Sequence, residues 1–393
     1  MIKNRNLVYK LRRNLPEIQI VHDFLAQTKL KQLKKKLLPK NIVEYGENYP
    51  DKIPEIIEKC KENRSNQINR LIKFYNNYLK TWNIHFPEEE YQCRRVQMLF
   101  DCMAYGFDPD EFNYYGLFEK SYLEKRKYVT SLDRFLMQYQ LSDFKALQIV
   151  FDKTETANIF KKYYKRDVIT IGNKKDFSVF QNFASHHDSM VIKQVSNSSG
   201  HGVSFERIDK NNLSEQFSKI LSLGRCSVEE LIIQSEVLSA FNSSINTSRI
   251  MTFYTKHGVI IGPCFFRTGK AGSFVDNGGS GGIMIAIDPK TGVLNSDGYD
   301  EYPIVFTEHP DSHIIFKGFQ LPDWDKCLSI VKEMSELIPK VGYVGWDMAY
   351  TADNEWVIVE ANGGSHIMTQ LMYNEGCKEE INAYMADMHI YVS

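Results

Sequence analysis

The chain has 393 residues, of which 43% are hydrophobic and 25% are charged, and its net charge is −1. This length exceeds the roughly 100–200 residues usual for one compact domain, so we expect two or three lobes. The near-neutral charge argues against nucleic acid or another polyanion as a partner of the whole molecule, and no apolar stretch approaches the roughly 20 residues needed to cross a bilayer.

The N-terminal segment "MIKNRNLVYKLRRNLPEIQ" lacks the apolar core and small-residue cleavage site of a secretory signal. The seven cysteines are scattered, odd in number and never spaced as CxxC. This pattern predicts reduced thiols in a cytoplasmic protein, and neither a disulfide framework nor a zinc site.

Residues 1–40 carry eleven Lys/Arg and two Asp/Glu, including the run "KLKQLKKKLLPK". A solvated helix face is the simpler interpretation. Weak electrostatic contact with a membrane surface is the alternative.

Residues 1–145 are predicted to form a mainly helical domain. The segments "SNQINRLIKFYNNYLKTW" and "YQCRRVQMLFDCMAYGF" repeat apolar residues every three or four positions and contain few glycines. In "FDPDEF", Asp108 before Pro109 predicts the end of one helix and the start of another.

Near residue 150 the sequence changes to short β-branched and apolar runs that alternate with turn signals. The segments "DSMVIKQV" and "VSFERI" are predicted strands on either side of the flexible turn "SNSSGHG". A predicted amphipathic helix, "NLSEQFSKILSL", and a predicted strand, "EELIIQSEV" (residues 229–237), follow.

Farther along, "TSRIMTFYTKHGVIIGPCFFR" predicts two strands joined at "KHG". The segment "DNGGSGGIMIAID" predicts a glycine loop that enters a strand, and "LPDWDKCLSIVKEMSELI" predicts a helix. The strands are expected to be mostly antiparallel, which indicates an α+β fold and not a strict βαβ repeat.

The predicted hairpin "GWDMAYTADNEWVIVEAN" (residues 345–362) carries an acid in each arm. With Asp353-Asn354 as a two-residue turn, the numbers of paired residues sum to 707. Asp347 then faces Glu360 directly across the strands.

Asn362 lies two residues beyond Glu360 on the same face, while the alternate positions form an apolar core face. Directly opposed side chains lie about 4.5–5.5 Å apart at Cβ, where like charges destabilise a strand pair. A hard divalent cation would remove this penalty, and Mg²⁺ prefers oxygen ligands. Asp347, Glu360 and Asn362 therefore predict a Mg²⁺ site completed by nucleotide phosphates. The simpler alternative is an exposed hairpin whose acids pair with lysines.

Two lysines are candidate phosphate ligands. Lys193 lies within the apolar strand "MVIKQV" beside the Gly/Ser turn, and an edge-strand lysine is the alternative interpretation. Lys153 follows Asp152 at a predicted helix start, where a cation is unfavourable. Its position there suggests a role in binding phosphate, and an ordinary surface lysine is the alternative interpretation. The turn at residues 196–202 could close over phosphate oxygens through backbone N–H groups, although it is not a P-loop and could be a plain flexible hairpin.

Two arginines are candidates for binding the transferred group. Arg249 and Arg267 lie in neighbouring predicted strands, and arginine matches phosphate or carboxylate as a bidentate fork. Arg267 comes just before the loop "TGKAGSFVDNGGSGG", which is rich in glycine and polar donors. Such a loop is typical of an anion-binding or substrate-facing segment, and a plain surface loop is the alternative.

With these pieces in order, the segment from about 150 to 365 resembles the ATP-grasp superfamily, and most closely its sugar-transfer-associated branch. The matching pieces are "DK" at 152–153, "VIKQVSNSSGHGV" at 191–203, "LIIQSEV" at 231–237, "NSSINTSRIMT" at 242–252, "FFRTGKAGSFVDNGGSGGI" at 265–283 and "GWDMAYTADNEWVIVEANGG" at 345–364.

The resemblance implies an ATP-grasp fold, in which two α+β lobes (residues 146–237 and 238–393) clasp ATP after the helical domain. It also implies ATP with one or two Mg²⁺ ions as cofactors, with Mn²⁺ as a substitute. The resemblance implies that the ATP phosphates are bound by Lys153 and Lys193 and covered by a flap that contains Ser199, Gly200 and Gly202. It implies that adenine contacts a strand between the lobes that contains Gln234, Glu236 and Val237. It further implies that Mg²⁺ is held by Asp347, Glu360 and Asn362, and that the transferred phosphoryl group is bound by Arg267 with Arg249.

Two departures from the family limit these implications. Gln234 and Ser235 stand where many members carry acidic residues, which blurs the adenine and ribose contacts. The helical first domain suits the sugar-transfer-associated branch alone and leaves the acceptor site undefined.

The chemistry of the family is ligation, in which a carboxylate forms an acyl-phosphate that an amine or thiol then attacks. We therefore expect a carbon–nitrogen ligase that acts on small-molecule carboxylate and amine substrates, with a sugar acid in polysaccharide biosynthesis as the favoured substrate. The alternatives are a phosphotransferase using the same ATP site and a non-catalytic nucleotide-binding partner of a glycosyltransferase complex.

Overall fold

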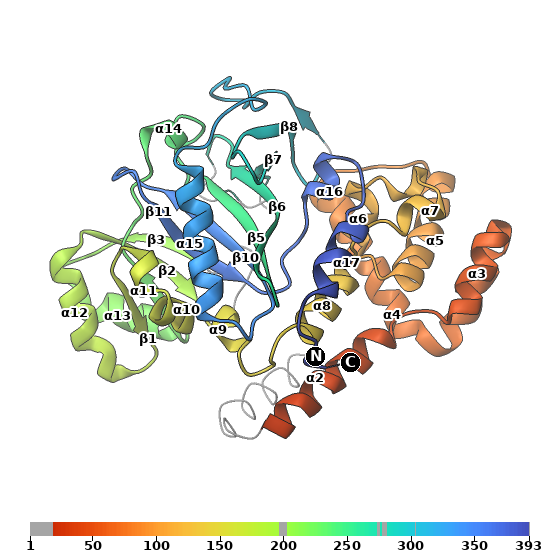
Figure 1. Ribbon diagram of the computed structural model, residues 1–393, viewed down its shortest axis with the longest axis horizontal. Helices are drawn as coiled ribbons and strands as arrows, with labels where there is room; N and C mark the ends of the chain where they lie inside the picture. The colour runs from red at the N-terminus through yellow and green to blue at the C-terminus, as the bar shows by residue number, and fades with distance from the viewer. Residues whose placement is uncertain (1–18, 196–202, 273–275, 277–280, 303, 393) are drawn as a thin grey trace.

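The computed structural model describes residues 19–195, 203–272, 276, 281–302 and 304–392. Its N-terminal region is helical, as the sequence predicts, and lies beside a larger body built on two sheets (Figure 1). The helices of this region are α2 (Gln19–Lys34), α3 (Lys40–Asn48), α4 (Ile53–Thr81), α5 (Glu88–Tyr105), α6 (Pro109–Tyr114), α7 (Tyr122–Lys125) and α8 (Ser131–Gln140).

The break predicted at "FDPDEF" is present between α5 and α6. Helix α5 ends at Gly106, whose φ of 87° is readily adopted only by glycine. Helix α6 then begins after Asp108, which forms a capping box with Glu111.

The helical region shares its apolar core with the larger sheet. Phe100, Met103 and Phe112 from the helices belong to the same buried cluster as Phe265 and Met284 from the sheet. The helical region is therefore packed onto the sheet and does not form a core entirely its own.

Among the described residues, no helix is both long enough and apolar enough to cross a membrane. Helix α2 packs Ala26 and Leu30 into the core beside Phe144, whereas Lys31 and Lys34 of its last turn are exposed. This arrangement fits the interpretation of a solvated basic helix face. The first 18 residues lie outside the described part of the chain, so the membrane-contact alternative stays a prediction.

Three short helices, α9 (Gln148–Phe151), α10 (Lys153–Ile159) and α11 (Lys161–Tyr164), lead into a small antiparallel sheet with the strand order β1-β4-β2-β3. We call this unit the small lobe. Its elements are β1 (Val168–Ile171), α12 (Phe177–His186), β2 (Ser189–Gln194), β3 (Val203–Arg207), α13 (Leu213–Ser222) and β4 (Cys226–Glu229).

The small lobe buries one face of its sheet and turns the other face toward the larger sheet. Met190 and Ile192 of β2 pack against α12 and α13 in a separate apolar cluster. Because side chains alternate along a strand, Lys193 of β2 and Glu229 of β4 lie on the opposite face.

The larger sheet is antiparallel, with the strand order β11-β10-β5-β6-β7-β8-β9. Its strands are β5 (Thr247–Thr255), β6 (Gly258–Thr268), β7 (Ile283–Ile287), β8 (Leu294–Tyr299), β9 (Val305–Phe306), β10 (Tyr343–Tyr350) and β11 (Trp356–Asn362). The accompanying helices are α14 (Glu236–Ser239), α15 (Trp324–Leu337), α16 (Thr369–Met372) and α17 (Lys378–Ala386). The strands predicted on either side of "KHG", the strand after the glycine loop and the helix at "LPDWDKC" are all confirmed.

The two faces of the larger sheet have different environments. Ile250, Phe266 and Trp346 face α15 within the main core. The neighbouring positions Arg249 and Asp347 therefore lie on the other face, which the helical region covers only in part.

The strand predicted over residues 229–237 is wrong. Strand β4 ends at Glu229, and Gln234 makes only an isolated bridge with Thr351. Helix α14 begins at Glu236, preceded by Ser235 in an extended conformation at the N-cap. The Ser235 side chain makes no capping bond; its N–H donates to the Tyr350 carbonyl at 3.0 Å, and its own carbonyl accepts from the Ser239 N–H at 2.9 Å, so the chain turns here into a short helix.

Strands β10 and β11 form the predicted hairpin, but its turn is longer than predicted. The Thr351 N–H donates to the Glu355 carbonyl (2.9 Å), and the Asn354 N–H donates to the Thr351 carbonyl (3.0 Å). Residues 352–354 therefore form a three-residue loop, in which Asn354 takes the positive φ of 60°. The predicted two-residue turn at Asp353-Asn354 is wrong.

A β-bulge restores the predicted register farther along the hairpin. Near the turn Tyr350 pairs with Trp356, so the numbers of paired residues sum to 706 and not to 707. The register shifts after Asp347, where Val359 is the extra residue, and Asp347 pairs with Glu360 as predicted.

Candidate active site

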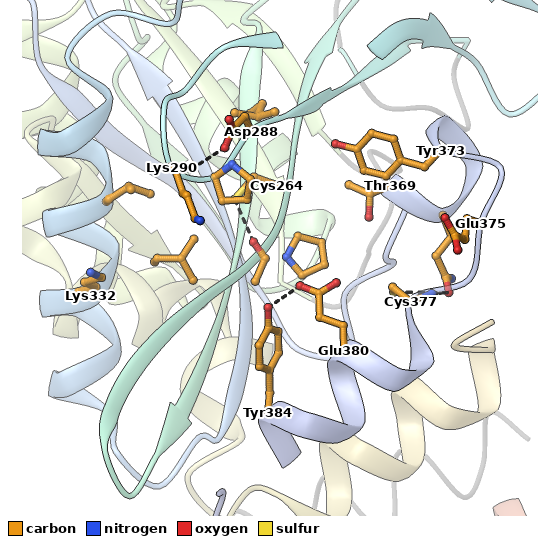
Figure 2. A pocket seen from close by; sticks show the side chains of 17 residues that line it. Cys264, Asp288, Lys290, Lys332, Thr369, Tyr373, Glu375, Cys377, Glu380 and Tyr384 are labelled. Carbon is orange, nitrogen blue, oxygen red and sulfur yellow. Dashed lines mark hydrogen bonds between the residues drawn. The ribbon is translucent and has the colours of Figure 1, made fainter. Parts of the chain in front are cut away.

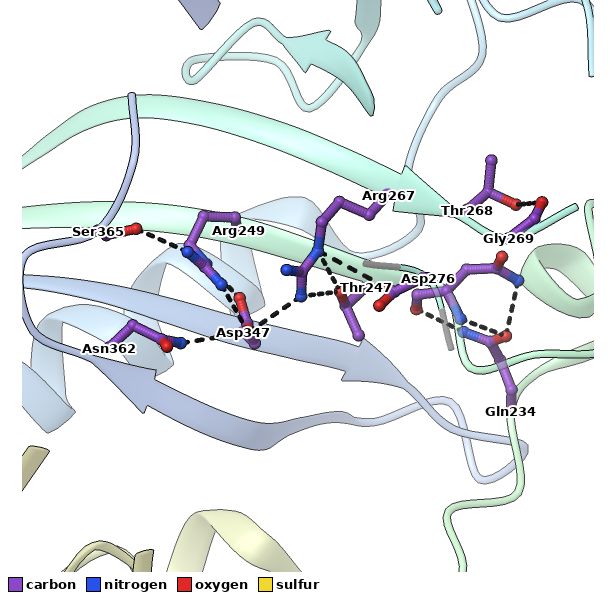
Figure 3. A network of polar contacts seen from close by, with 11 residues as sticks. Gln234, Thr247, Arg249, Arg267, Thr268, Gly269, Asp276, Asp347, Asn362 and Ser365 are labelled. Atoms are coloured by element: carbon purple, nitrogen blue, oxygen red, sulfur yellow. Dashed lines mark hydrogen bonds and ion pairs between the residues drawn. The ribbon is translucent and has the colours of Figure 1, made fainter. Parts of the chain in front are cut away.

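Asp347 lies at the centre of a polar cluster (Figure 3), on the face of the larger sheet that points away from α15. Strand pairing places it opposite Arg249 of β5 on one side and Glu360 of β11 on the other. Its side chain is 3% exposed, so its charge depends on protein partners.

Three side chains donate hydrogen bonds to the Asp347 carboxylate. Arg249 binds both oxygens in a bidentate pair through Nε and Nη2. Arg267 Nη2 lies 3.0 Å from Oδ2, and Asn362 Nδ2 lies 3.2 Å from the same oxygen. Arg249 also donates to the Ser365 hydroxyl at 2.7 Å. The predicted arginines and two of the three predicted metal ligands are thus in direct contact.

A second acid balances Arg267 from the other side. The Thr247 hydroxyl accepts from Arg267 at 3.0 Å and 2.6 Å, and it donates to Asp276 at 2.5 Å. The Asp276 carboxylate lies 3.7 Å from Arg267 Nε. Arg267 is therefore held between two buried carboxylates (Figure 3).

These contacts and burial shift the pKa values of the cluster in different directions. Burial opposes ionisation of Asp347, but the Arg249 and Arg267 guanidinium groups bring its pKa below the ordinary value. Burial also opposes the charge of Arg267, yet Asp276 and Asp347 raise its pKa. For Asp276 burial prevails and its pKa is raised.

Glu360 is the more accessible of the two facing acids, with a side chain that is 37% exposed. Its carboxylate lies 3.6 Å from the ammonium group of Lys153, the first residue of α10. Asp152 caps this helix by accepting from the backbone N–H of Thr154 at 2.9 Å, as expected for a helix start. The cap thus fixes the end of the helix that carries Lys153.

Lys193 belongs to a buried network that the sequence analysis missed. Its ammonium group donates to Glu229 at 2.7 Å and to the Val359 carbonyl of β11 at 3.4 Å. Arg166 also donates to Glu229, at 2.6 Å, and to the Ile358 carbonyl at 2.7 Å. Two cations on the small lobe therefore reach the backbone of β11, just before Glu360.

Glu229 could have been found from the sequence. It is an acid in the short apolar strand "CSVE", the same kind of signal that identified Lys193. Burial opposes its ionisation, but Lys193 and Arg166 lower its pKa to about 2. Burial lowers the pKa of Lys193, and Glu229 opposes that shift.

The remaining predicted nucleotide ligands either lie outside the described residues or have other partners. Ser199, Gly200 and Gly202 lie outside the described residues. The Gln234 side chain is used internally, because its amide bonds the backbone and side chain of Asn246.

Two further predicted ligands lie in a helix, where the sequence predicted a strand. Glu236 and Val237 lie in the first turn of α14 and are exposed, not in a strand between the lobes. Their predicted place in a linking strand is wrong.

The facing acids do not require a metal ion for their neutralisation. The hairpin alone suggested two carboxylates that repel each other. The structure instead pairs Asp347 with two arginines and Glu360 with Lys153. The charge argument for Mg²⁺ is therefore weaker than the sequence indicated, and the case depends on the ligand atoms that remain available.

Two cavities among the described residues lie outside this cluster. One, of about 530 Å³, lies between β6, α15 and the segment from α16 to α17, with Lys290 and Lys332 on one side and Glu380 and Tyr384 on the other (Figure 2). None of the predicted site residues is among the described residues that line it. The second cavity, of about 750 Å³, lies in the helical region.

A family profile described as sugar-transfer associated ATP-grasp matches residues 136–385, more than half of the chain. This chain belongs to the sugar-transfer associated ATP-grasp family. The matched range contains every described residue of the Asp347 cluster and both lysines, so the family resemblance drawn from the sequence is confirmed.

Solved structures with similar folds share little sequence with this ATP-grasp protein. The ATP-grasp ligase PsnB, complexed with a minimal precursor, is 11% identical over 63% of each chain, with a TM-score of 0.39. D-alanyl-alanine synthetase A from Vibrio cholerae O1 biovar eltor str. N16961 is 10% identical over 63% of this chain and 67% of that chain (TM-score 0.41). D-alanine–D-alanine ligase from Bacillus anthracis, complexed with ATP, is 14% identical over 63% and 68% (TM-score 0.40). This match spans just under two thirds of the PsnB chain, whereas the match to PsnB complexed with a phosphomimetic precursor variant, Mg and ADP spans 75% of it. The comparison with curated proteins found no match.

Proposed function

We propose that this protein is an ATP- and Mg²⁺-dependent ligase that joins a carboxylate to an amine, or to a thiol, through an acyl-phosphate. The supporting observation is the convergence of charged groups from both lobes. Lys153 and Lys193 approach β11 from the small-lobe side, while Asp347, Glu360 and Arg267 lie on the larger sheet. In an ATP-grasp protein, this boundary is where a triphosphate would be held.

The ligand atoms fit a hard cation. A carboxylate offers about four lone-pair positions. Among the described residues, Asp347 Oδ1 accepts only from Arg249, whereas Oδ2 accepts from Arg249, Arg267 and Asn362. Oδ1 therefore retains capacity for a metal ion, as does the partly exposed Glu360. Asp347, Glu360 and Asn362 would hold Mg²⁺, which when bound would neutralise charge on the triphosphate.

The chain's own residues would position the phosphates and offset their charge. Lys153 and Lys193 would bind phosphate oxygens as point charges. Arg267 stays protonated, because its flanking carboxylates raise its pKa, and it would face the transferred phosphoryl group. A substrate carboxylate oxygen would attack the γ-phosphorus as the bond to ADP breaks. The amine nitrogen would then attack the acyl carbon, expelling phosphate and releasing a proton.

A sugar acid used in polysaccharide building is the substrate that we favour. The support is the family description alone, sugar-transfer associated ATP-grasp. The described residues of the Asp347 cluster add no information on the acceptor.

One observation favours a second function, that of a non-catalytic nucleotide-binding partner. Asp347 is already neutralised by Arg249 and Arg267, so its retention does not by itself require a working metal site. ADP release separates the two functions. Release that depends on both a carboxylate and an amine supports a ligase, and nucleotide binding without turnover across such pairs supports the partner role.

The Glu360→Gln variant tests the metal assignment. It keeps the shape of the side chain but removes the charge, so we expect Mg²⁺-dependent ADP production to fall by at least about a hundredfold, as for loss of a key electrostatic group. Glu355→Gln, on the same hairpin but at an exposed position in the turn, is the matched control and should retain activity. Unchanged ADP production in Glu360→Gln would remove Glu360 from the metal site.

A further inference from the structure

The cavity of about 750 Å³ in the helical region is strongly basic. It lies between the end of α2, helix α4, the α5–α6 connection and α8. Four cations and one acid line it, an excess of three positive charges: Lys35, Lys36, Arg64, Arg70 and Asp108. Because the whole chain carries a net charge of −1, this excess is a local feature.

The acid of the lining does not neutralise Lys35, Lys36 or Arg64. Asp108 is committed to the fold, because it caps α6 and accepts from the Ser131 hydroxyl at 2.5 Å. Within the described ranges of the chain, no carboxylate is in ion-pair contact with Lys35, Lys36 or Arg64. The ammonium groups of Lys35 and Lys36 are therefore available to a ligand, and Arg64 adds positive charge to the lining.

A distortion of α4 positions the cations. Arg64 has φ −130° and ψ 20°, which are not helical values, and it kinks the helix. Its guanidinium group donates to the carbonyl oxygens of Lys35 at 3.2 Å, Lys36 at 3.0 Å and Leu37 at 3.0 Å. These contacts satisfy carbonyls just beyond the end of α2 and hold Lys35 and Lys36 at the cavity.

Phe135 of α8 lies between the cavity and the turn that follows the Asp347 cluster. Its side chain lines the cavity, is 42% exposed, and would have two ring atoms 3.7 Å from a Cβ placed on Gly364. The Gly364 carbonyl accepts from Arg134 at 2.8 Å. Gly364 is two residues beyond Asn362, which contacts Asp347. One aromatic side chain therefore contacts both the cavity and the turn next to the cluster.

A buried polar side chain at this turn has no partner. Gln138, one helical turn after Arg134, is 1% exposed, and neither its amide nitrogen nor its amide oxygen has a hydrogen-bond partner among the described residues. Its Oε1 would lie 3.0 Å from a Cβ placed on Gly363. Buried polar groups are normally paired, so this amide is an exception at the turn next to Phe135, although it does not itself line the cavity.

We propose that the basic cavity binds the phosphate-bearing part of the substrate, a small molecule with a diphosphate group and a ring. A diphosphate carries about two to three negative charges, which Lys35, Lys36 and Arg64 can balance, whereas a single carboxylate would leave most of that positive charge unbalanced. Phe74 and Phe135, each 42% exposed, offer aromatic faces on which a ring of the substrate packs. The concave shape suits a small molecule better than a membrane surface.

The identification of this anion as the substrate depends on the proposed ligase function, whereas anion binding itself does not. The probe is inorganic pyrophosphate, titrated by calorimetry into the full chain in Mg²⁺-free, low-salt buffer. The test variant is Lys35→Glu/Lys36→Glu, in which both side chains are exposed and line the cavity. The matched control is Lys31→Glu/Lys34→Glu, with the same charge change at exposed positions of α2 that do not line the cavity.

We expect the test variant to weaken pyrophosphate binding by about tenfold or more, and the control variant by less than about twofold. The proposal is overturned if the wild type does not bind pyrophosphate, or if the two double variants lose affinity equally. A separate titration with a non-hydrolysable ATP analogue tests the ligase function, and its failure would leave the pyrophosphate result standing.

Discussion

At the scale of single residues, the charged side chains at the boundary between the lobes are mostly buried and are paired with other protein groups. Glu229 is 3% exposed and accepts from both Arg166 and Lys193. Asp347 is equally buried and accepts from Arg249 and Arg267. Such groups link the protonation of the site to the stability of the fold.

The pKa of Glu229 gives the first prediction at this scale. Because its folded-state pKa is about 2, below the ordinary value, the charged carboxylate stabilises the fold above about pH 4.5. That stabilisation is lost as the pH falls toward about 2, and it amounts to about 3 kcal/mol in total. Between about pH 4.5 and pH 2, the free energy of unfolding measured with denaturant should fall by about 3 kcal/mol more for the wild type than for Glu229→Gln. Glu230→Gln, at a more exposed neighbouring position, should follow the wild type, and parallel curves for all three proteins would contradict the assignment.

The sequence predicted the acids better than it predicted their partners. The predicted pairing of Asp347 with Glu360 came from strand alternation and an assumed hairpin turn. The contacts of Arg249 and Arg267 with Asp347 depend on the order of β5, β6 and β10 in the sheet, which no local pattern contains. Glu229 carried a local signal, as an acid in a short apolar strand, but its partners Lys193 and Arg166 come from other parts of the chain.

At the scale of elements, the hairpin shows how a correct pairing can follow from a wrong turn. The three-residue loop shifts the register by one position, and the bulge at Val359 shifts it back before Glu360. The two irregularities cancel at Asp347 and Glu360. Polar turn residues such as Asp353 and Asn354 fit either loop length, and nothing in the local sequence marks the bulge.

Asn354 provides a test of the turn. Its φ of 60° lies in the left-handed region, where residues with a Cβ other than Asn and Asp are disfavoured. We expect Asn354→Ala to lower the free energy of unfolding by about 1 kcal/mol, and Asn354→Gly to change it by less than about 0.5 kcal/mol. The exposed neighbour Asp353 has no positive φ, so Asp353→Ala is the control and should be nearly neutral. Equal decreases in the free energy of unfolding for Asn354→Ala and Asp353→Ala, measured with denaturant, would contradict the three-residue loop and support the two-residue turn.

At the scale of the whole molecule, the described apolar clusters divide the chain unequally. The buried cluster of the small lobe contains only residues between Ile171 and Val228. The helical region, in contrast, shares a cluster with Phe265 and Met284 of the larger sheet. The sequence identified a helical first domain, but a pattern of apolar positions does not say which surface those positions will meet.

The division into two buried apolar clusters predicts which elements unfold together. We expect amides of α5 and β6 to exchange with one common opening free energy, since both elements depend on the same buried cluster. Amides of β2 and β4 should exchange through a separate opening of lower free energy. Native-state hydrogen exchange with rising denaturant, followed by mass spectrometry, measures both. Protection of α5 that falls below that of β6, or small-lobe amides that open only with the rest, would contradict this division.

The contacts of Lys193 have a consequence for the order of events during nucleotide loading. This lysine already bonds Glu229 and the Val359 carbonyl, so under the proposed function a triphosphate would compete with both partners for the ammonium group. Such competition yields less affinity than an idle cation would provide. If the triphosphate won the contact from Val359, one of the two hydrogen bonds that join this side of the molecule to β11 next to Glu360 would be lost, while Arg166 would keep the other to the Ile358 carbonyl. Nucleotide loading would then loosen the backbone beside the neighbouring acid without freeing it.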